Sequence, residues 1–343
     1  MKTKVKKFRF IAKIAQKIAC LTACFAFSAS AASVAKVGDT EYETLEAAIG
    51  AVKDGETVVV NAGAYKLVGS QSDYMGRAFA IKAAEGAAVS FDMSQAVTLG
   101  GAKITFEGVT FDYKTNNNYT GLQHADTLVY NDCTINGKVF LYAASETFNR
   151  CTFNQSAADY NVWTYGAQKV AFNACTFNCA GKSVLLYNEG TNEKTDLMVT
   201  ACVFKASAEA AGKAAIEIDT SLMKGDTSVT IDDQTTATGF ATGSNSGNSL
   251  WNDKKQTQAT NKNATVEVAG ETVFTPAVAD GSKERPYSRE QFGAMTRAEY
   301  IAAQSRLGGT LYVSVGDYSY DQYGTLAMAS GRTPSDRFPT TRS

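Results

Sequence analysis

Several residue types that disorder or catalysis would require are scarce in this sequence. Its 343 residues include four prolines and a single histidine, His124, and 44% of them are apolar. So few prolines in so apolar a chain argue against bulk disorder, and one histidine excludes a zinc site built from several histidines. Between Val34 and Phe274 the only arginines are Arg77 and Arg150, which leaves few candidates for a strong base.

The first 31 residues have the features of a secretory signal peptide. Seven basic residues and no acid occur in the first seventeen positions, an apolar run follows at 18–27, and Ala29-Ser30-Ala31 fits an A-x-A cleavage pattern. The run is too short to span a bilayer, so we expect a secreted or surface-bound protein without a transmembrane segment. Residues 21–24 also resemble the lipobox of bacterial lipoproteins, with Cys24 as the lipid anchor. That alternative is less favoured because it would shorten the apolar run.

Removal of the signal peptide would leave an acidic chain. Of the 33 basic residues 26 would remain against 34 acidic ones, a net charge of −8. Nucleic-acid binding needs clustered lysine and arginine. No such cluster occurs in the chain that remains after this removal, so nucleic acid is not an expected partner.

An internal repeat predicts the fold. Five eight-residue segments align without gaps, at 104–111, 128–135, 146–153, 170–177 and 197–204. They start 24, 18, 24 and 27 residues apart, and a second motif lies between them at 139–142, 162–165, 184–187 and 216–219. Each unit holds two or three very short strands, which cannot bury an apolar face until the units stack. We therefore predict an all-β solenoid, a parallel β-helix over residues 34–275 with about ten coils.

Alternation within the first motif predicts its inward side. The cysteine and the final aromatic share one face, so the cysteines are expected to fill the interior as small apolar residues. Disulfide, metal or redox roles are the alternative, and an odd number of cysteines argues against a disulfide framework. Asn131, Asn149 and Asn173 are expected at the corner between strands, in a left-handed conformation, and hydrogen-bonded from coil to coil. The mature chain contains Cys133, Cys151, Cys175, Cys179 and Cys202.

The F-N-x-C-T-F units resemble the coils of the pectate-lyase-like superfamily of right-handed parallel β-helices. The opening segment 37–55 is also similar to the amphipathic helix that begins many bacterial members, with Leu45, Ala48, Ile49 and Val52 on one face and Gly55 closing it. The resemblance implies a right-handed β-helix, but it is weak for activity. The superfamily includes polysaccharide lyases, glycosidases and non-catalytic surface proteins.

The sequence changes character at residue 279. Two capping boxes, at 288–291 and 296–299, predict a helix that ends at Gly308-Gly309, and residues 310–315 alternate as a strand. Little apolar material follows. We expect a small C-terminal α/β module at 279–343, truncated or lacking a partner, which resembles C-terminal segments of large gut-bacterial surface proteins.

The residues that the resemblance would require for catalysis are poorly represented. Lyases of the superfamily use an arginine or lysine base and usually Ca²⁺ held by several carboxylates. Arg150 is expected as a solvated corner residue, Asp232-Asp233 as a turn or strand end, and His124 as a structural or solvated residue. No catalytic residue, metal site or cofactor is predicted.

The second motif points to a different kind of site. If Val139/Leu141, Val162/Thr164 and Val184/Leu186 face inward, the alternate positions form two outward columns that are largely aromatic. Exposed aromatic ridges usually mark a contact, and sugar rings stack on aromatic faces. Two alternatives remain: other parts of the chain, or a partner protein, cover the rings, or the alternation is reversed and the rings are core. The predicted ligand-binding residues are Phe140, Tyr142, Trp163, Tyr165 and Tyr187.

These observations favour a non-catalytic secreted or bacterial cell-surface protein, an adhesin or glycan-binding module. Its expected partner is an extracellular polysaccharide, or a glycan or protein on a host or neighbouring cell. The second hypothesis is a lyase or hydrolase that acts on acidic polysaccharide. The third is a passive stalk that displays another module.

Overall fold

The computed structural model describes residues 33–67, 74–113, 120–187, 194–207, 213–219, 225–243, 246–253 and 264–274, and three short strands between 313 and 328. The predicted signal peptide, Cys24 and the predicted helix after residue 288 lie outside the described residues.

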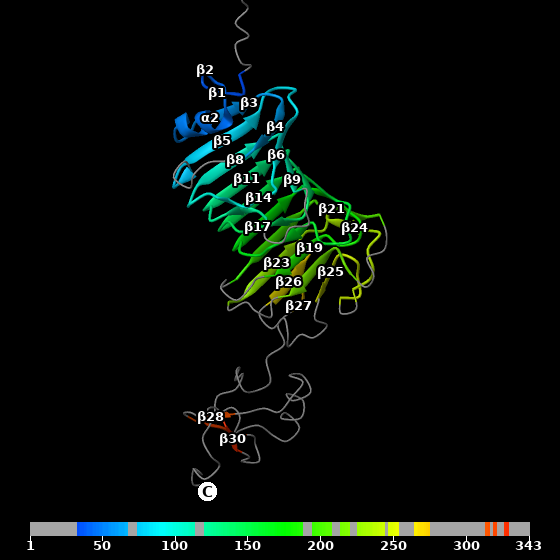
Figure 1. Cartoon of the computed structure of the whole chain (residues 1–343). Helices are drawn as coiled ribbons and strands as arrows, with labels where there is room; N and C mark the ends of the chain where they lie inside the picture. The colour runs from blue at the N-terminus through cyan, green and yellow to red at the C-terminus, as the bar shows by residue number, and fades with distance from the viewer. Residues whose placement is uncertain are drawn as a thin grey trace, which may run out of the picture.

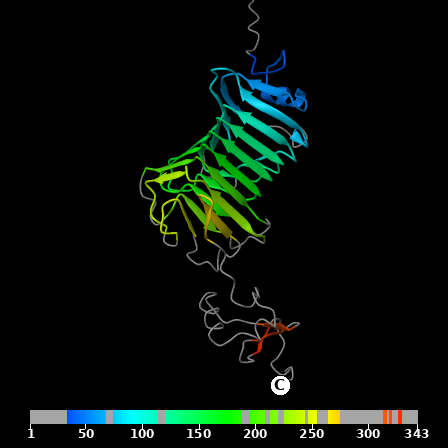
Figure 2. The same cartoon turned by 180° about the vertical axis from the view of Figure 1, so that it is seen from behind.

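The chain forms a right-handed parallel β-helix whose coils stack in sequence order (Figures 1 and 2). One face is a 12-stranded sheet, called the long sheet here, and its nine central strands run parallel. Each of these strands belongs to one coil, so nine coils are present among the described residues where about ten were expected. These strands are β3 (Thr57–Val60), β5 (Ala78–Ala83), β8 (Lys103–Glu107), β11 (Thr127–Asn131), β14 (Ser145–Asn149), β17 (Lys169–Asn173), β20 (Asp196–Thr200), β23 (Thr227–Ile231) and β26 (Ala264–Val268).

Two further sheets complete the coils. The eight-stranded second sheet contains β4 (Gly63–Lys66), β6 (Val89–Asp92), β9 (Thr110–Tyr113), β12 (Thr134–Gly137), β15 (Thr152–Gln155), β18 (Thr176–Cys179), β21 (Val203–Ala206) and β24 (Thr236–Thr238). The five-stranded third sheet contains β13 (Val139–Phe140), β16 (Val162–Trp163), β19 (Val184–Tyr187), β22 (Ile216–Asp219) and β25 (Trp251–Asp253). A separate parallel pair joins β7 (Val97–Thr98) to β10 (Leu122–Gln123).

The register of the coils confirms the repeat. Leu128 pairs with Ile104 on one side and Glu146 on the other, and Glu146 pairs in turn with Val170. The second sheet follows the same alignment, with Phe153 opposite Phe177. Segments that align in the sequence are therefore neighbours in space, one coil apart.

Aromatic columns fill the interior. On the second sheet Phe177 stacks on Phe153 at a ring distance of 4.5 Å and on Phe204 at 4.4 Å. On the long sheet Tyr130 stacks on Phe148 at 4.3 Å. Full burial of such a ring stabilises the fold by about 1.5–3 kcal/mol, so these columns are a main source of stability.

The cysteines are buried and free, as expected for an interior column. The thiol of Cys151 donates to the carbonyl of Tyr130 at 3.3 Å, and that of Cys175 donates to the carbonyl of Phe148 at the same distance. Both of these thiols therefore contact the backbone of the preceding coil.

The asparagine corner is partly as predicted. Asn149 Nδ2 donates to Asn131 Oδ1 at 2.8 Å, and Asn173 Nδ2 donates to Asn149 Oδ1 at 2.9 Å. The left-handed backbone, however, lies on the next residue and not on the asparagine, because the asparagine is the last residue of its strand. The left-handed residues at this corner are Gly108, Asp132, Arg150, Ala174 and Ala201, with φ between 52° and 67°.

A helix and a hairpin close the N-terminal end. Helix α2 (Leu45–Ala51) begins at Thr44, whose hydroxyl accepts from Ala47 N, and its predicted apolar face is buried. The helix ends at Val52, whose N–H donates to Ala48 O, three residues before Gly55, so the predicted closure at Gly55 is wrong. Strands β1 (Ala35–Val37) and β2 (Thr40–Tyr42) pair antiparallel, and β1 covers the edge of β3.

At the other end β27 (Glu271–Phe274) pairs antiparallel with β26. The C-terminal segment contributes a three-stranded antiparallel sheet of β28 (Val313–Val315), β29 (Tyr318–Tyr320) and β30 (Leu326–Met328). Strand β28 falls within the strand predicted at 310–315.

Candidate functional site

The outer face of the third sheet carries the predicted binding residues. Val139, Leu141, Val162, Val184 and Leu186 all belong to the central core. Because side chains alternate along a strand, the residues between them point away from that core. The inward–outward assignment made from the second motif is therefore confirmed, and the reversed alternative is wrong.

The five predicted rings form one continuous network, which we call the outer cluster (Phe140, Tyr142, Trp163, Tyr165 and Tyr187). Phe140 stacks on Trp163 at 5.4 Å between ring centroids, and Tyr165 packs edge-on against Tyr142 at 5.5 Å. Tyr187 packs edge-on against Trp163 at 5.6 Å. Three successive coils thus contribute to a single aromatic surface. That this surface binds a ligand stays a prediction.

The members of the outer cluster differ in exposure. Phe140 is only 2% exposed, whereas the other four rings are half-buried. Part of the cover on Phe140 comes from the previous coil, where its N–H donates to Thr120 O at 3.0 Å. A Cβ on Gly121 would lie 2.0 Å from the Phe140 carbonyl oxygen. The previous coil can therefore lie this close to Phe140 only because residue 121 is a glycine. Phe140 is therefore a support for the other rings and not a surface residue.

Two carboxylates continue the aromatic columns, and the sequence reasoning missed them. Glu217 is the in-register neighbour of Leu185, and Asp219 that of Tyr187. Both are buried. Glu217 accepts from Ala214 N at 2.8 Å and from Asn252 Nδ2 at 3.4 Å. The alternation in residues 216–219 was the available signal, since Glu217 and Asp219 occupy the positions that are aromatic in earlier coils.

A cation and a tyrosine outside the prediction also border the outer cluster. Lys138 Nζ lies 5.5 Å from the ring centre of Phe140 and 5.9 Å from that of Trp163, and it pairs with Asp159 at 2.8 Å. Tyr160 packs perpendicular to Trp163 at 5.8 Å. Burial raises the pKa of Tyr160, and the carboxylates of Glu217, Asp159 and Asp219 raise it further.

This arrangement suits recognition of a polar ligand that also has apolar faces. Aromatic faces contribute large contact area at low entropic cost, and polar groups beside such faces can orient a ligand by hydrogen bonds.

The other charged residues weighed as catalytic candidates have structural partners. Arg77 donates to the carbonyls of Ile49 and Val52 at the end of α2. Arg150 forms an exposed ion pair with Asp132.

The remaining two candidates also have structural explanations. Asp232 accepts from Ala201 N and Thr235 N, which makes it a turn residue. His124 is exposed with a left-handed backbone.

Neither a metal site nor a membrane-spanning helix occurs in the described part of the chain. There, no three histidine, cysteine, aspartate or glutamate side chains are placed to hold a metal ion. No helix within those same residues is long and apolar enough to cross a membrane.

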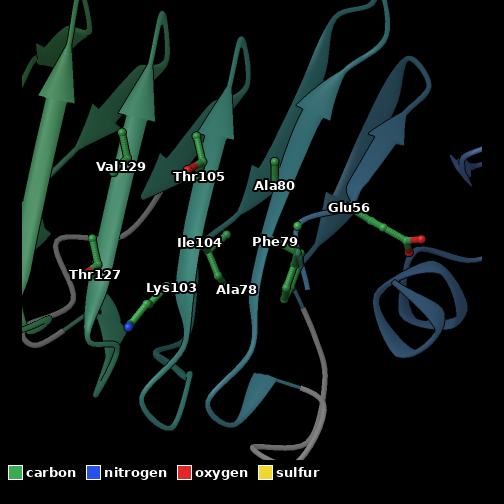
Figure 3. A pocket seen from close by; sticks show the side chains of 10 residues that line it. Glu56, Ala78, Phe79, Ala80, Lys103, Ile104, Thr105, Thr127 and Val129 are labelled. Carbon is green, nitrogen blue, oxygen red and sulfur yellow. The ribbon is translucent and has the colours of Figure 1, made fainter. Parts of the chain in front are cut away.

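A hollow lies outside the predicted site, at the start of strands β5, β8 and β11 (Figure 3). Its volume is about 330 Å³, and the small residues Gly55, Ala78 and Ala80 leave the space. Only Glu56 and Lys103 bring charge to it. None of the predicted site residues borders this hollow.

Comparisons of the chain with protein-family models, with curated proteins and with solved structures found no match.

Proposed function

We propose that this chain is a secreted or bacterial cell-surface protein of the pectate-lyase-like kind, which binds an extracellular glycan without catalysis. The four half-buried rings of the outer cluster are its contact surface, with Trp163 at the centre and the buried Phe140 beneath them. The observation that carries the proposal is the contact of five rings from three coils on the outside of the core. A β-helix needs aromatic residues inside, but nothing in its packing requires them outside.

The geometry of the coils supports a polymeric ligand. Neighbouring coils are about 4.8 Å apart, so an extended glycan that runs along the helix axis would meet a ring at each coil. Tryptophan is among the residues most often found at binding hot spots. Trp163 contacts Phe140, Tyr160 and Tyr187, which holds its ring in place.

The test is a glycan array probed with the mature protein and with Trp163→Ala. The variant is expected to lose binding by about 30-fold, the equivalent of about 2 kcal/mol at a hot spot. Tyr65→Ala is the matched control, because Tyr65 is a half-buried tyrosine on the second sheet. Equal binding by the wild type and Trp163→Ala would refute the contact surface.

The enzymatic alternative has a direct assay. Incubation with polygalacturonate and Ca²⁺ would give products that absorb in the ultraviolet if the chain were a lyase, because proton abstraction followed by elimination leaves an unsaturated sugar. Such products would replace this proposal by the lyase. A wild-type protein that binds no glycan on the array would favour the passive stalk.

A further inference from the structure

Buried polar atoms without partners gather at one place beside the outer cluster. Native proteins satisfy nearly all buried polar groups, so each exception needs an explanation. In the part of the chain that the structure describes, five side-chain atoms are buried without a hydrogen-bond partner, and all five come from residues in or just before β16 and β19. They are Tyr160 Oη, Asn161 Nδ2, Asn161 Oδ1, Trp163 Nε1 and Ser183 Oγ.

These residues are spatial neighbours. Val162 N donates to Ser183 O at 3.1 Å, which places Asn161 and Ser183 one coil apart. Val139 N donates to Asn161 O at 2.8 Å, so Lys138 holds the same position in the coil before.

The Lys138 ammonium lies over the outward rings of the outer cluster. By this equivalence and by strand alternation, Asn161 and Ser183 lie on the outer side as well.

The segment 155–161 carries two of these residues, and its Tyr160 packs against a third, Trp163. It links β15 to β16 and folds back on itself, since Ala157 N donates to Gln155 Oε1 and Gln155 Nε2 donates to Tyr160 O. The Tyr160 ring lies across Trp163, and Lys182 Nζ lies 5.3 Å from its centre. The Lys138–Asp159 ion pair fastens the segment to the sheet at 2.8 Å.

In the structure Tyr160 of this segment lies against Trp163, which we call the closed position. Some contacts stabilise this position and others destabilise it. The ion pair and the ring contacts hold it. The five polar atoms oppose it, because each is buried and has no partner among the described residues. An open position would restore their hydrogen bonds to solvent or to a ligand.

We propose that Tyr160 is a gate over a closed polar subsite, formed by Asn161, Trp163 and Ser183, which accepts one neutral, hydroxyl-rich sugar unit of a bound glycan. The inference deepens the proposed function and rests on it. The five atoms supply both donors and acceptors and carry no charge, which matches sugar hydroxyls. A uronate would bring its carboxylate toward Glu217 and Asp219, to a chain of net charge −8 once its signal peptide is removed. The match to hydroxyls favours a neutral ligand, and the acidic probe below tests the opposing attraction of Lys138 and Lys182.

The gate is tested first without a ligand. The sequence has two tryptophans, Trp163 and Trp251, so Trp251→Phe isolates the Trp163 emission. In this background Tyr160→Ala is expected to increase acrylamide quenching of Trp163 about threefold or more. Tyr160→Phe keeps the ring and should leave quenching unchanged. Unchanged quenching in Tyr160→Ala, in a variant whose circular dichroism matches the parent, would overturn the gate.

The ion pair offers a second variant that does not touch the rings. Asp159→Asn weakens the fastening to Lys138 and should raise quenching by a smaller factor than Tyr160→Ala. Asp132→Asn is the matched control, because it removes the exposed pair with Arg150 and should change nothing. Equal quenching in Asp159→Asn and Asp132→Asn would count against the proposed fastening.

Binding then tests the ligand class with laminarin and hydroxyethylcellulose as neutral probes and polygalacturonate as the acidic probe. If only the open protein binds the ligand, the apparent Kd equals the Kd of the open form divided by the fraction of protein that is open. Tyr160→Ala is therefore expected to bind a neutral probe about tenfold more tightly than wild type, and Ser183→Ala in that background to lose part of the gain. Stronger binding of polygalacturonate would overturn the neutral subsite.

Failure of the gate differs from failure of the proposed function. If wild type binds a neutral probe and Trp163→Ala does not, but Tyr160→Ala gains nothing, the contact surface stands and the gate is refuted. If neither wild type nor Tyr160→Ala binds any probe while quenching rises, the segment opens but the subsite does not take these glycans, and both binding claims are refuted.

Discussion

The carboxylate of Glu146 accepts a hydrogen bond from the backbone N–H of Tyr142 at 2.9 Å. Glu146 lies inside the β-helix, at the position that Leu128 and Val170 occupy in adjacent coils, whereas Tyr142 belongs to the outer cluster. The same carboxylate accepts from Ala143 N at 3.1 Å and from the Tyr130 hydroxyl at 3.4 Å. A buried acid thus holds the turn that carries one of the outer rings.

This acid predicts a pH dependence of stability. Burial raises the pKa of Glu146 from 4.5 to about 8, against the lowering effect of its hydrogen bonds. The folded state therefore favours the protonated form. Its contribution is fully present below pH 4.5 and is lost as the pH rises toward 8. Glu146→Gln keeps the shape without the charge, so its free energy of unfolding should not fall over this range. We expect the variant to exceed wild type at pH 8 by on the order of 3–5 kcal/mol, measured by urea unfolding.

The control for this prediction is Glu107→Gln. Glu107 is exposed and pairs with Lys82 on the long sheet, so its replacement should change stability by less than about 1 kcal/mol at any pH. A Glu146→Gln variant that follows the wild-type pH curve would contradict the buried, protonated acid.

The left-handed corner predicts stabilising glycines. Ala174 and Ala201 have φ of 52°, a conformation that costs an L-residue roughly 1–2 kcal/mol. The equivalent corner of an earlier coil already has Gly108, with φ of 67°. Ala174→Gly should therefore raise the free energy of unfolding by about 0.5–1 kcal/mol, despite the entropy that glycine adds to the unfolded chain. Thermal unfolding measures it.

The matched comparison is Ala171→Gly, in the middle of strand β17. There glycine has no strain to relieve and should destabilise by about 0.5–1 kcal/mol. Two substitutions of the same chemistry, three residues apart, should thus have opposite signs. The same sign in both would contradict the corner geometry.

The sequence predicted the register of the coils to the residue because a parallel β-helix places equivalent positions directly above one another. A gapless alignment of 128–135 with 146–153 therefore predicts which residues pair between the two coils, and the pairing of Leu128 with Glu146 confirms it. The outward direction of Trp163 followed from the same period. The left-handed conformation of the corner, however, was assigned to the wrong residue, since a strand end and a left-handed turn are one position apart.

The parts that sequence reasoning missed are not periodic. Segment 155–161 occurs once, and nothing in its composition shows that Tyr160 lies across Trp163. The ion pair of Lys138 with Asp159 joins residues 21 positions apart, in a loop without an equivalent in the next coil. Such contacts depend on how a loop folds back, which no repeat specifies.

The asparagine ladder predicts unequal effects along its length. Asn149 donates to Asn131 and accepts from Asn173, so Asn149→Ala removes two hydrogen bonds and leaves two partners unsatisfied. We expect a loss of about 1–3 kcal/mol in urea unfolding. A second ladder, at Asn136, Asn154 and Asn178, ends at an exposed residue. Asn178→Ala removes one exposed hydrogen bond and should lower the free energy of unfolding by less than half as much. Equal losses in the two variants would contradict the view that the central asparagine of a ladder contributes more than the terminal one.

The interior cysteine column predicts thiols that are protected but not oxidised. Cys133, Cys151, Cys175, Cys179 and Cys202 are all buried. Burial and the neighbouring Cys133 thiol raise the pKa of Cys151 to about 12, with the thiol contact as the larger cause, and a protonated thiol is a poor nucleophile. Native protein produced without residues 1–31 should therefore react with Ellman's reagent only as fast as it unfolds. In guanidinium, without reductant, all five should be alkylated by iodoacetamide, as counted by mass spectrometry. A count of three or one would mean that neighbouring coils form a disulfide, and fast labelling of native protein would mean that the column is open to solvent.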